Sequence, residues 1–191
     1  MERWLDAGYG ECVLRDERCQ KEVAERLLFR HGQDYDLGDW VVMPNHVHVL
    51  LQPLGNVSLE EIMRPIKGVS ARNINRMLER SGAMWMQESF SHIVRSLEQL
   101  KKFQRYIQMN PEKAGLPATD FSYEQRWEIV RSTLGIASLR SPFGQPAAGY
   151  LRCALVPARR SAFSTAPAFP NNQTVGSRRA CELCRSSMPL L

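Results

Sequence analysis

Hydrophobic and polar positions follow a helical period first and then a strand period in the opening quarter of the chain. In "DERCQKEVAERLLFRH" (16–31), Val23, Leu27 and Leu28 recur at helical spacing among charged residues, and this predicts an amphipathic helix. Two β-rich runs follow, "YDLGDWVVM" (35–43) and "HVHVLLQP" (46–53), which are separated by the turn-forming pair Pro44-Asn45. These two runs predict a β-hairpin.

The next stretch, "SLEEIMRPIKGVSARNINRMLERSG" (58–82), predicts helix with an interruption. Ser58 and Glu61 form a capping-box pattern at its start. Pro65 and Gly68 are helix breakers, so we expect a short helix, a bend and a second helical stretch that ends near Gly82.

The region after this helix predicts a loop and short strand, followed by one more helix. "AMWMQESFSHIVRS" (83–96) is rich in aromatic residues and has no clear period. "LEQLKKFQRYIQMN" (97–110) has apolar residues at helical spacing, and we expect Pro111 to stop this helix.

The periodic pattern ends near residue 141. Residues 141–191 contain six of the eleven prolines and much Ala, Ser and Arg. Such a composition is typical of disorder. We therefore divide the chain into one folded domain, residues 1–141, and a basic, disordered tail, residues 142–191.

Composition places the protein in a broad class. A chain of 191 residues is long enough for one domain with a full core. It contains no apolar run of the ~18 residues that a membrane span needs, and its start lacks a secretory pattern. The five cysteines are odd in number and scattered, which argues against a disulfide framework and favours a reducing cytoplasm.

The formal net charge of +5 is unevenly distributed. Residues 1–40 hold 6 Lys and Arg against 10 Asp and Glu, whereas residues 64–105 hold 9 against 3. A basic face on a folded domain suggests a polyanionic partner. The solvated face of an ordinary helix explains the same pattern equally well.

Two of the four histidines, His46 and His48, stand one residue apart in the second strand of the predicted hairpin. Side chains alternate along a strand, so both imidazoles point to one side, about 7 Å apart. Both could then converge on one divalent ion, with oxygen ligands completing the shell. The alternative is a pair of half-exposed histidines on the solvated face of the hairpin.

Tyr106 and Asn110 are four residues apart in the last predicted helix, and therefore share a face. A phenol is a competent nucleophile when a metal polarises its target, and an amide oxygen can ligate a metal. The alternative is that Tyr106 is an amphipathic boundary residue and that Asn110 only ends the helix.

With both segments in view, the chain resembles the REP-associated tyrosine transposases, which belong to the single-tyrosine, HUH-type (IS200-like) transposases. The resemblance covers roughly residues 4–116 and rests above all on "MPNHVHVL" combined with "YIQMNPEKAGL". Other matching segments are "WLDAGYGECVL", "SLEEIMRPIKGVSARNINRML" and "MWMQESFSHIVRS".

The resemblance implies an α+β, ferredoxin-like fold with an antiparallel sheet and helices on one face. It also implies a transposase that cuts and rejoins single-stranded DNA at hairpin repeats. His46 and His48 would hold Mg²⁺ or Mn²⁺ with Asn110 as third ligand, and Tyr106 would form a 5′-phosphotyrosine bond and release a 3′-OH. Such an enzyme would act in the cytoplasm, at the nucleoid, as a monomer or homodimer.

Basic residues in the middle of the chain are the expected phosphate contacts of this enzyme. They are Arg64, Lys67, Arg72, Arg76, Lys101, Lys102 and Arg105. Trp40, Trp85 and Phe90 could stack on unpaired bases or could equally pack in the core.

Three departures from the family pattern are visible. The extended strand that usually precedes the "WLDAG" segment is missing, so we expect exposed sheet edges and a weakened core. Ser91 stands where the family tends to carry Asp, and the tail resembles nothing in the family.

Two other functions stay open on the sequence. A hairpin-DNA-binding protein that has lost cleavage would keep the basic middle and need no metal. A zinc site could combine Cys181 and Cys184 with His46 and His48.

Overall fold

A computed structural model describes residues 11–87, 89–127 and 151–159. Its elements are η1 (Val13–Arg15), α2 (Glu17–Leu28), β1 (Tyr35–Met43), β2 (His46–Pro53), α3 (Leu59–Met77), β3 (Phe90–Ile93), α4 (Leu97–Lys113), β4 (Ser122–Glu124) and β5 (Arg152–Pro157). No helix in the described part of the chain is long and apolar enough to cross a membrane.

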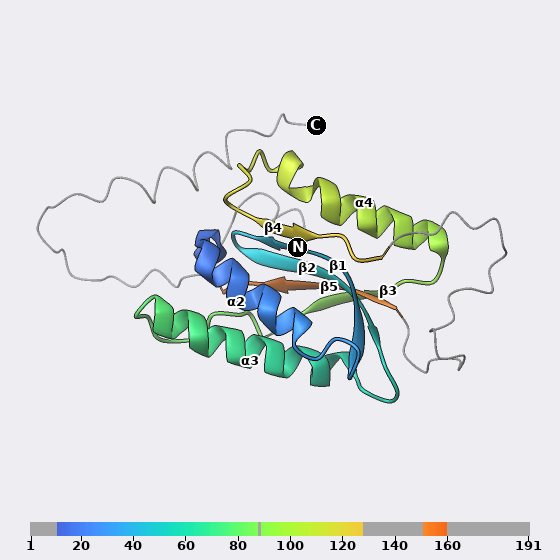
Figure 1. The fold of residues 1–191 in the computed structure, drawn as a ribbon, viewed down its shortest axis with the longest axis horizontal. Helices are drawn as coiled ribbons and strands as arrows, with labels where there is room; N and C mark the ends of the chain where they lie inside the picture. Colours follow the sequence, from blue (N-terminus) through green and yellow to red (C-terminus); the bar gives the residue numbers. More distant parts are fainter. Residues whose placement is uncertain (1–10, 88, 128–150, 160–191) are drawn as a thin grey trace, which may run out of the picture.

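The strands form one five-stranded sheet in the order β3-β5-β2-β1-β4, and every neighbouring pair is antiparallel (Figure 1). The hairpin is confirmed, because β1 pairs with β2 from Tyr35–Pro53 to Met43–His46 around the Pro44-Asn45 turn. The predicted α+β class with an antiparallel sheet is therefore confirmed.

The helices lie on both faces of the sheet, so the expectation that they share one face is wrong (Figure 1). Helices α2 and α3 cover one face and form the larger core with strand residues such as Val42 and Val49. Helix α4 covers the other face, where Leu100 and Ile107 pack with Val41 and Leu50. Both faces of β1 and β2 are thus buried, which explains their nearly continuous apolar sequences.

Helix α3 continues through Pro65 and Gly68 without a break and ends at Met77, so the predicted bend and the end near Gly82 are wrong. An interior proline costs a helix roughly 3 kcal/mol. Burial of Ile62, Ile66 and Ile74 on one stripe contributes about 1.5–3 kcal/mol each and outweighs this cost. The capping box of Ser58 and Glu61 is present as predicted.

Helix α4 likewise passes through Pro111 and ends at Lys113, so the expected stop at Pro111 is wrong. Pro111 is itself buried, and the backbone N–H of Ala114 still bonds to the carbonyl of Asn110. Tertiary packing of the helix has overridden the local signal of the proline.

Strand β5 corrects the prediction of a disordered tail for residues 152–157. It pairs with β2 on one side and with β3 on the other, and Ala154, Leu155 and Val156 are fully buried. The short run "RCALVP" could not be recognised as a strand, because prolines and small residues surround it in the sequence. The edge of β2 is not open, because β5 covers it. Residues 142–150 and 160–191 of the predicted tail lie outside the described residues.

Gly38 lies in β1 where the pairing with β2 shifts register between Leu37 and Trp40. A Cβ atom at this position would lie 2.5 Å from the ring of Trp127. The chain after β4 can therefore cross β1 closely only because residue 38 has no side chain.

We expect Gly38→Ala to lower the free energy of unfolding by about 1–3 kcal/mol, because the new methyl group overlaps the indole ring. The control is Gly68→Ala on α3, where a Cβ meets nothing within 4 Å and should stabilise the helix by about 0.5–1 kcal/mol. Urea unfolding measures both, and equal effects of the two substitutions would contradict the close packing.

Ala154→Pro tests strand β5. Proline removes one ladder hydrogen bond and is not tolerated in the middle of a sheet, so we expect a loss of about 3 kcal/mol or more. A thermal midpoint equal to that of the unsubstituted protein would show that residues 152–157 do not belong to the sheet.

Candidate active site

Strand β2 directs His46 and His48 toward α4, while Val47 and Val49 point into the opposite core. Both histidine side chains are about 1% exposed. The alternative of half-exposed histidines on a solvated hairpin face is therefore wrong. Their positions are fixed from both sides, because β1 and β5 each pair with this stretch of β2.

The two imidazoles face each other, with their Nε2 atoms 3.1 Å apart and their ring planes at 89°. Nδ1 of His46 lies 2.6 Å from the side-chain oxygen of Asn45. An amide oxygen only accepts hydrogen bonds, so Nδ1 carries the proton and Nε2 keeps its lone pair. Asn45, at the hairpin turn, thus orients His46 through Nδ1. In the sequence Asn45 is recognisable only as a turn residue.

Burial keeps both histidines neutral. It lowers the pKa of His46 well below its usual 6.5, and the neighbouring His48 lowers it further. Burial alone lowers the pKa of His48 to about 3. With the lone pair on Nε2 of His46, Nε2–H of His48 donates across the 3.1 Å contact. Neutral imidazole is the form that binds metal ions, and a metal between the rings would take the place of this shared proton, which would move to Nδ1 of His48 or leave.

Helix α4 brings Tyr106 against this pair. The ring centroids of Tyr106 and His48 are 5.1 Å apart, with their planes at 85°. The helix starts at Leu97 and is capped by Ser96, whose hydroxyl oxygen accepts the N–H of Gln99. Its buried side includes Leu100 and Ile107. The Lys113 ammonium lies 5.7 Å from the centroid of the Tyr106 ring. The two sequence segments that first suggested chemistry are therefore neighbours in space.

Asn110 is buried one helical turn after Tyr106. Its side-chain nitrogen has no hydrogen-bond partner among the described residues. Rotation of the amide by 180° exchanges its nitrogen and oxygen, which occupy similar space. A buried amide with an unsatisfied end fits a position that an added group completes.

The donor set fits a divalent metal. Consider an ion with two ligand atoms, each about 2.1 Å away, and a ligand–metal–ligand angle of about 90°. The two ligand atoms are then about 3.0 Å apart, which is close to the 3.1 Å between the Nε2 atoms of His46 and His48. No group of three or more His, Cys, Asp or Glu side chains gathers in the described ranges. A metal here would therefore need the amide of Asn110, substrate oxygens or water beside the imidazoles. Cys181 and Cys184, of the alternative zinc site, lie outside those ranges.

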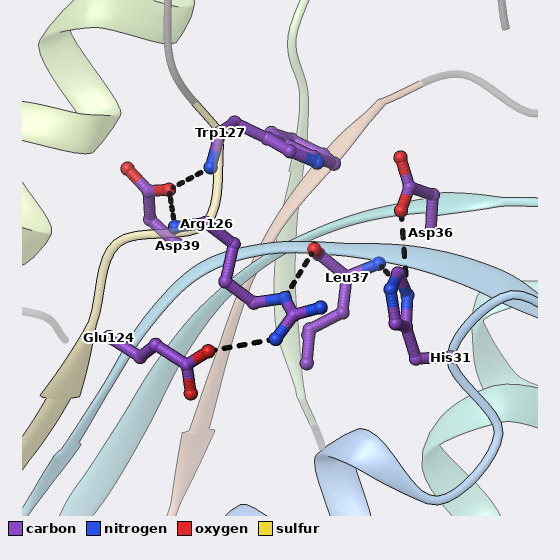
Figure 2. A network of polar contacts seen from close by, with 7 residues as sticks. All are labelled: His31, Asp36, Leu37, Asp39, Glu124, Arg126 and Trp127. Carbon is purple, nitrogen blue, oxygen red and sulfur yellow. Dashed lines mark hydrogen bonds and ion pairs between the residues drawn. The ribbon is translucent and has the colours of Figure 1, made fainter. Parts of the chain in front are cut away.

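A buried carboxylate, which no sequence motif indicates, joins α4 to the sheet. The irregular pairing after Leu37 turns Asp39 toward α4, where it is 1% exposed. One oxygen of Asp39 accepts the backbone N–H groups of Arg126 and Trp127, each at 2.9 Å (Figure 2). The other accepts the side-chain N–H of Gln104 at 2.8 Å.

We call the hydrogen bond between Asp39 and Gln104 the clamp. It attaches α4 to β1 at a point two residues before Tyr106. Arg126 adds to it by donating to the carbonyl of Leu37 and to Glu124 (Figure 2). Because a buried carboxylate is costly unless it is fully hydrogen-bonded, the clamp fixes one arrangement of β1, α4 and the chain after β4.

The predicted phosphate contacts lie on two different layers. Lys101, Lys102 and Arg105 are exposed on α4, the helix of Tyr106. The other four are on α3, which covers the opposite face of the sheet, so the structure does not bring all seven together: Arg64, Lys67, Arg72 and Arg76. Lys67 also donates to the carbonyl of Gln87 and to the hydroxyl of Ser89.

Two of the three candidate stacking residues are part of the core. Trp40 is 3% exposed and Trp85 is 8% exposed, and both pack in the core beneath α2 and α3. Stacking on DNA bases is therefore excluded for these two residues. Phe90 is half-buried on β3, and Ser91 beside it is exposed.

The model of one protein family, described as transposase IS200-like, matches residues 12–110, slightly more than half of the chain. The matched range contains the hairpin with His46 and His48 and the helix up to Tyr106 and Asn110. No curated protein and no solved structure matches the chain.

The chain belongs to the IS200-like transposase family. Membership indicates an enzyme that acts on DNA, whereas the REP-associated subtype stays a prediction.

The buried histidines predict a pH dependence of stability. Below pH 6.5 the unfolded chain binds protons that folded His46 and His48 do not bind, so stability falls as the pH falls, until the pH nears 3 for His48. Each histidine contributes up to about 1.4 kcal/mol per pH unit. Urea unfolding with a chelator from pH 7 to pH 5 should show a steeper loss than in His46→Gln/His48→Gln; parallel curves would contradict neutral burial.

Proposed function

We propose that the chain is a metal-dependent endonuclease and strand transferase that acts on single-stranded DNA at hairpin repeats. The observation that carries the proposal is the 5.1 Å approach of the Tyr106 ring to the ring of His48, beside the imidazole pair. A phenol next to two neutral imidazoles on a buried face combines a nucleophile with a metal-ligand pair.

His46, His48 and Asn110 would hold the ion, Mg²⁺ or Mn²⁺. When bound, the ion supplies Lewis-acid polarisation of a phosphate oxygen. Neutral imidazole and amide oxygen are both acceptable donors for such ions, and the fixed Nδ1–H of His46 keeps its Nε2 directed inward.

Tyr106 would carry out the bond exchange. Its phenolic oxygen loses its proton and attacks the phosphorus; a tyrosine–phosphate bond forms as the bond from phosphorus to the 3′ oxygen breaks. The leaving 3′ oxygen takes up a proton, and the 5′ phosphate stays on the protein. A second 3′-OH can reverse the reaction and rejoin strands, because the phosphotyrosine conserves the energy of the phosphodiester bond.

Surrounding residues support the reaction by position and charge. The Lys113 ammonium, 5.7 Å from the Tyr106 ring, and the exposed Lys101, Lys102 and Arg105 make this helix positive where a phosphate strand would approach. The buried clamp of Asp39 with Gln104 would hold the nucleophile's helix at a constant distance from the imidazoles.

Tyr106→Phe should lower the rate of covalent attachment to DNA by about a thousandfold or more, while DNA binding persists. A hairpin oligonucleotide labelled at its 3′ end should migrate with the protein on a denaturing gel in Mn²⁺, whereas a 5′ label should be released. Chelation of the metal, or His48→Gln, should also prevent the adduct.

The matched control is Tyr123→Phe, which removes a half-buried hydroxyl on β4 and should leave the adduct unchanged. An adduct that survives Tyr106→Phe, or that carries the 5′ label, would refute the mechanism. Hairpin binding by the unsubstituted protein without any adduct would instead support a DNA-binding protein that has lost cleavage.

A further inference from the structure

A cavity of about 600 Å³ lies beside the candidate active site, between the edge strand β3 and the first half of α4. This volume is in the range of about 300–1,000 Å³ that is typical of small-molecule sites. Its lining comes from β3, the loop that follows it, α4 and the start of β5, and includes His92, Arg95, Lys102, Phe103 and Arg152.

The charge of this cavity is strongly one-sided. Arg95, Lys102 and Arg152 line it, and no Asp or Glu does. Lys102 pairs with Glu98 at 3.0 Å, but both of these side chains are more than 70% exposed, so the pair is weak. Neither arginine forms an ion pair within the described part of the chain. Two guanidinium groups without a carboxylate partner there, and an ammonium whose partner is exposed and weakly bound, favour a phosphate group.

One wall of the cavity is aromatic. The rings of His92 and Phe103 are stacked, with their centroids 6.1 Å apart and their planes inclined by 23°. His92 is exposed, and one face of its ring lies against Phe103. A planar surface beside a cluster of cations is the arrangement with which proteins bind unpaired nucleotides.

The cavity lies on the same face of the sheet as the candidate active site and borders the same helix. Phe103 is three residues before Tyr106 on α4, so the two share one side of the helix. In the sheet, His92 pairs with Cys153, and His48 pairs with Leu155, two residues further along β5. His92 is therefore about 12 Å from His48 along the sheet surface, a distance that a few nucleotides of an extended strand can cover.

We propose that this cavity binds a nucleotide of the single-stranded DNA near the cleaved phosphate, with Arg95, Lys102 and Arg152 on its phosphate and the His92–Phe103 wall on its base. The choice of single-stranded DNA as the ligand rests on the proposed function. The cavity adds a site that the sequence analysis did not find, since Arg95 lies in a segment without clear period and Arg152 in the predicted tail.

The test measures binding separately from cleavage. A fluorescent single-stranded oligonucleotide is titrated with Tyr106→Phe protein in a chelator over a series of salt concentrations. Adding Arg95→Gln and Arg152→Gln should weaken binding about 5- to 10-fold and make the slope of log K against log salt shallower by about 0.7 for each phosphate that the protein no longer neutralises. The control is Lys21→Gln on α2, an exposed cation on the opposite side of the sheet.

The aromatic wall is tested on the same background. His92→Ala should weaken binding to the oligonucleotide, and His92→Phe should restore it, since a phenyl ring keeps the stacking surface. Thermal midpoints confirm that each variant is folded.

Unchanged affinity and unchanged salt slope in the folded Arg95→Gln/Arg152→Gln protein would overturn the cavity assignment even if the unsubstituted enzyme cleaves DNA. Conversely, the predicted weakening of binding in a protein that forms no adduct would uphold the cavity and refute only the cleavage mechanism.

Discussion

The burial of two imidazoles on one face of a central strand is the constraint on which the rest of the structure depends. Buried histidines must be neutral, and neighbouring elements must shield them from water. Strands β1 and β5 flank β2 and hold its backbone, while α4 closes the face and brings Tyr106 to His48. The site is therefore a product of sheet order rather than of any single loop.

Precision at this site depends on a second buried polar group. Asp39 accepts three hydrogen bonds, from Gln104 on α4 and from the backbone of Arg126 and Trp127. The close approach of Trp127 at Gly38 belongs to the same corner of the molecule. The hydrogen bonds of Asp39 therefore act on the middle of α4, at Gln104, and the apolar contacts of Leu100 and Ile107 lie on either side of that point.

Local sequence patterns predicted the elements well where one signal dominated. The hairpin and the capped start of α3 follow from alternation, turn residues and a capping box, and the same-face placement of His46 and His48 follows from strand geometry. The helix boundaries at Pro65 and Pro111 were wrong because burial of apolar stripes outweighs a local breaker, and burial is not visible in a short window.

Contacts between distant segments could not be predicted in this way. Residues 152–157 have few distinguishing features, and only their two pairing partners make them a strand. The hydrogen bond between Asp39 and Gln104 joins residues that are 65 positions apart. The cations of the cavity are also separated in sequence, because Arg95 precedes α4, Lys102 lies on it and Arg152 belongs to β5. Resemblance to a family identified His46, His48, Tyr106 and Asn110, but it said nothing of these supporting contacts.

The position of β5 also determines when the sheet around the histidines can be completed during synthesis. Leu155 is the partner of His48, so the imidazole pair gains its second flanking strand only after more than a hundred further residues have been added. Such long-range pairing folds late and slowly. In a nascent chain that ends before residue 152, the strand that carries both histidines would still have one unpaired edge.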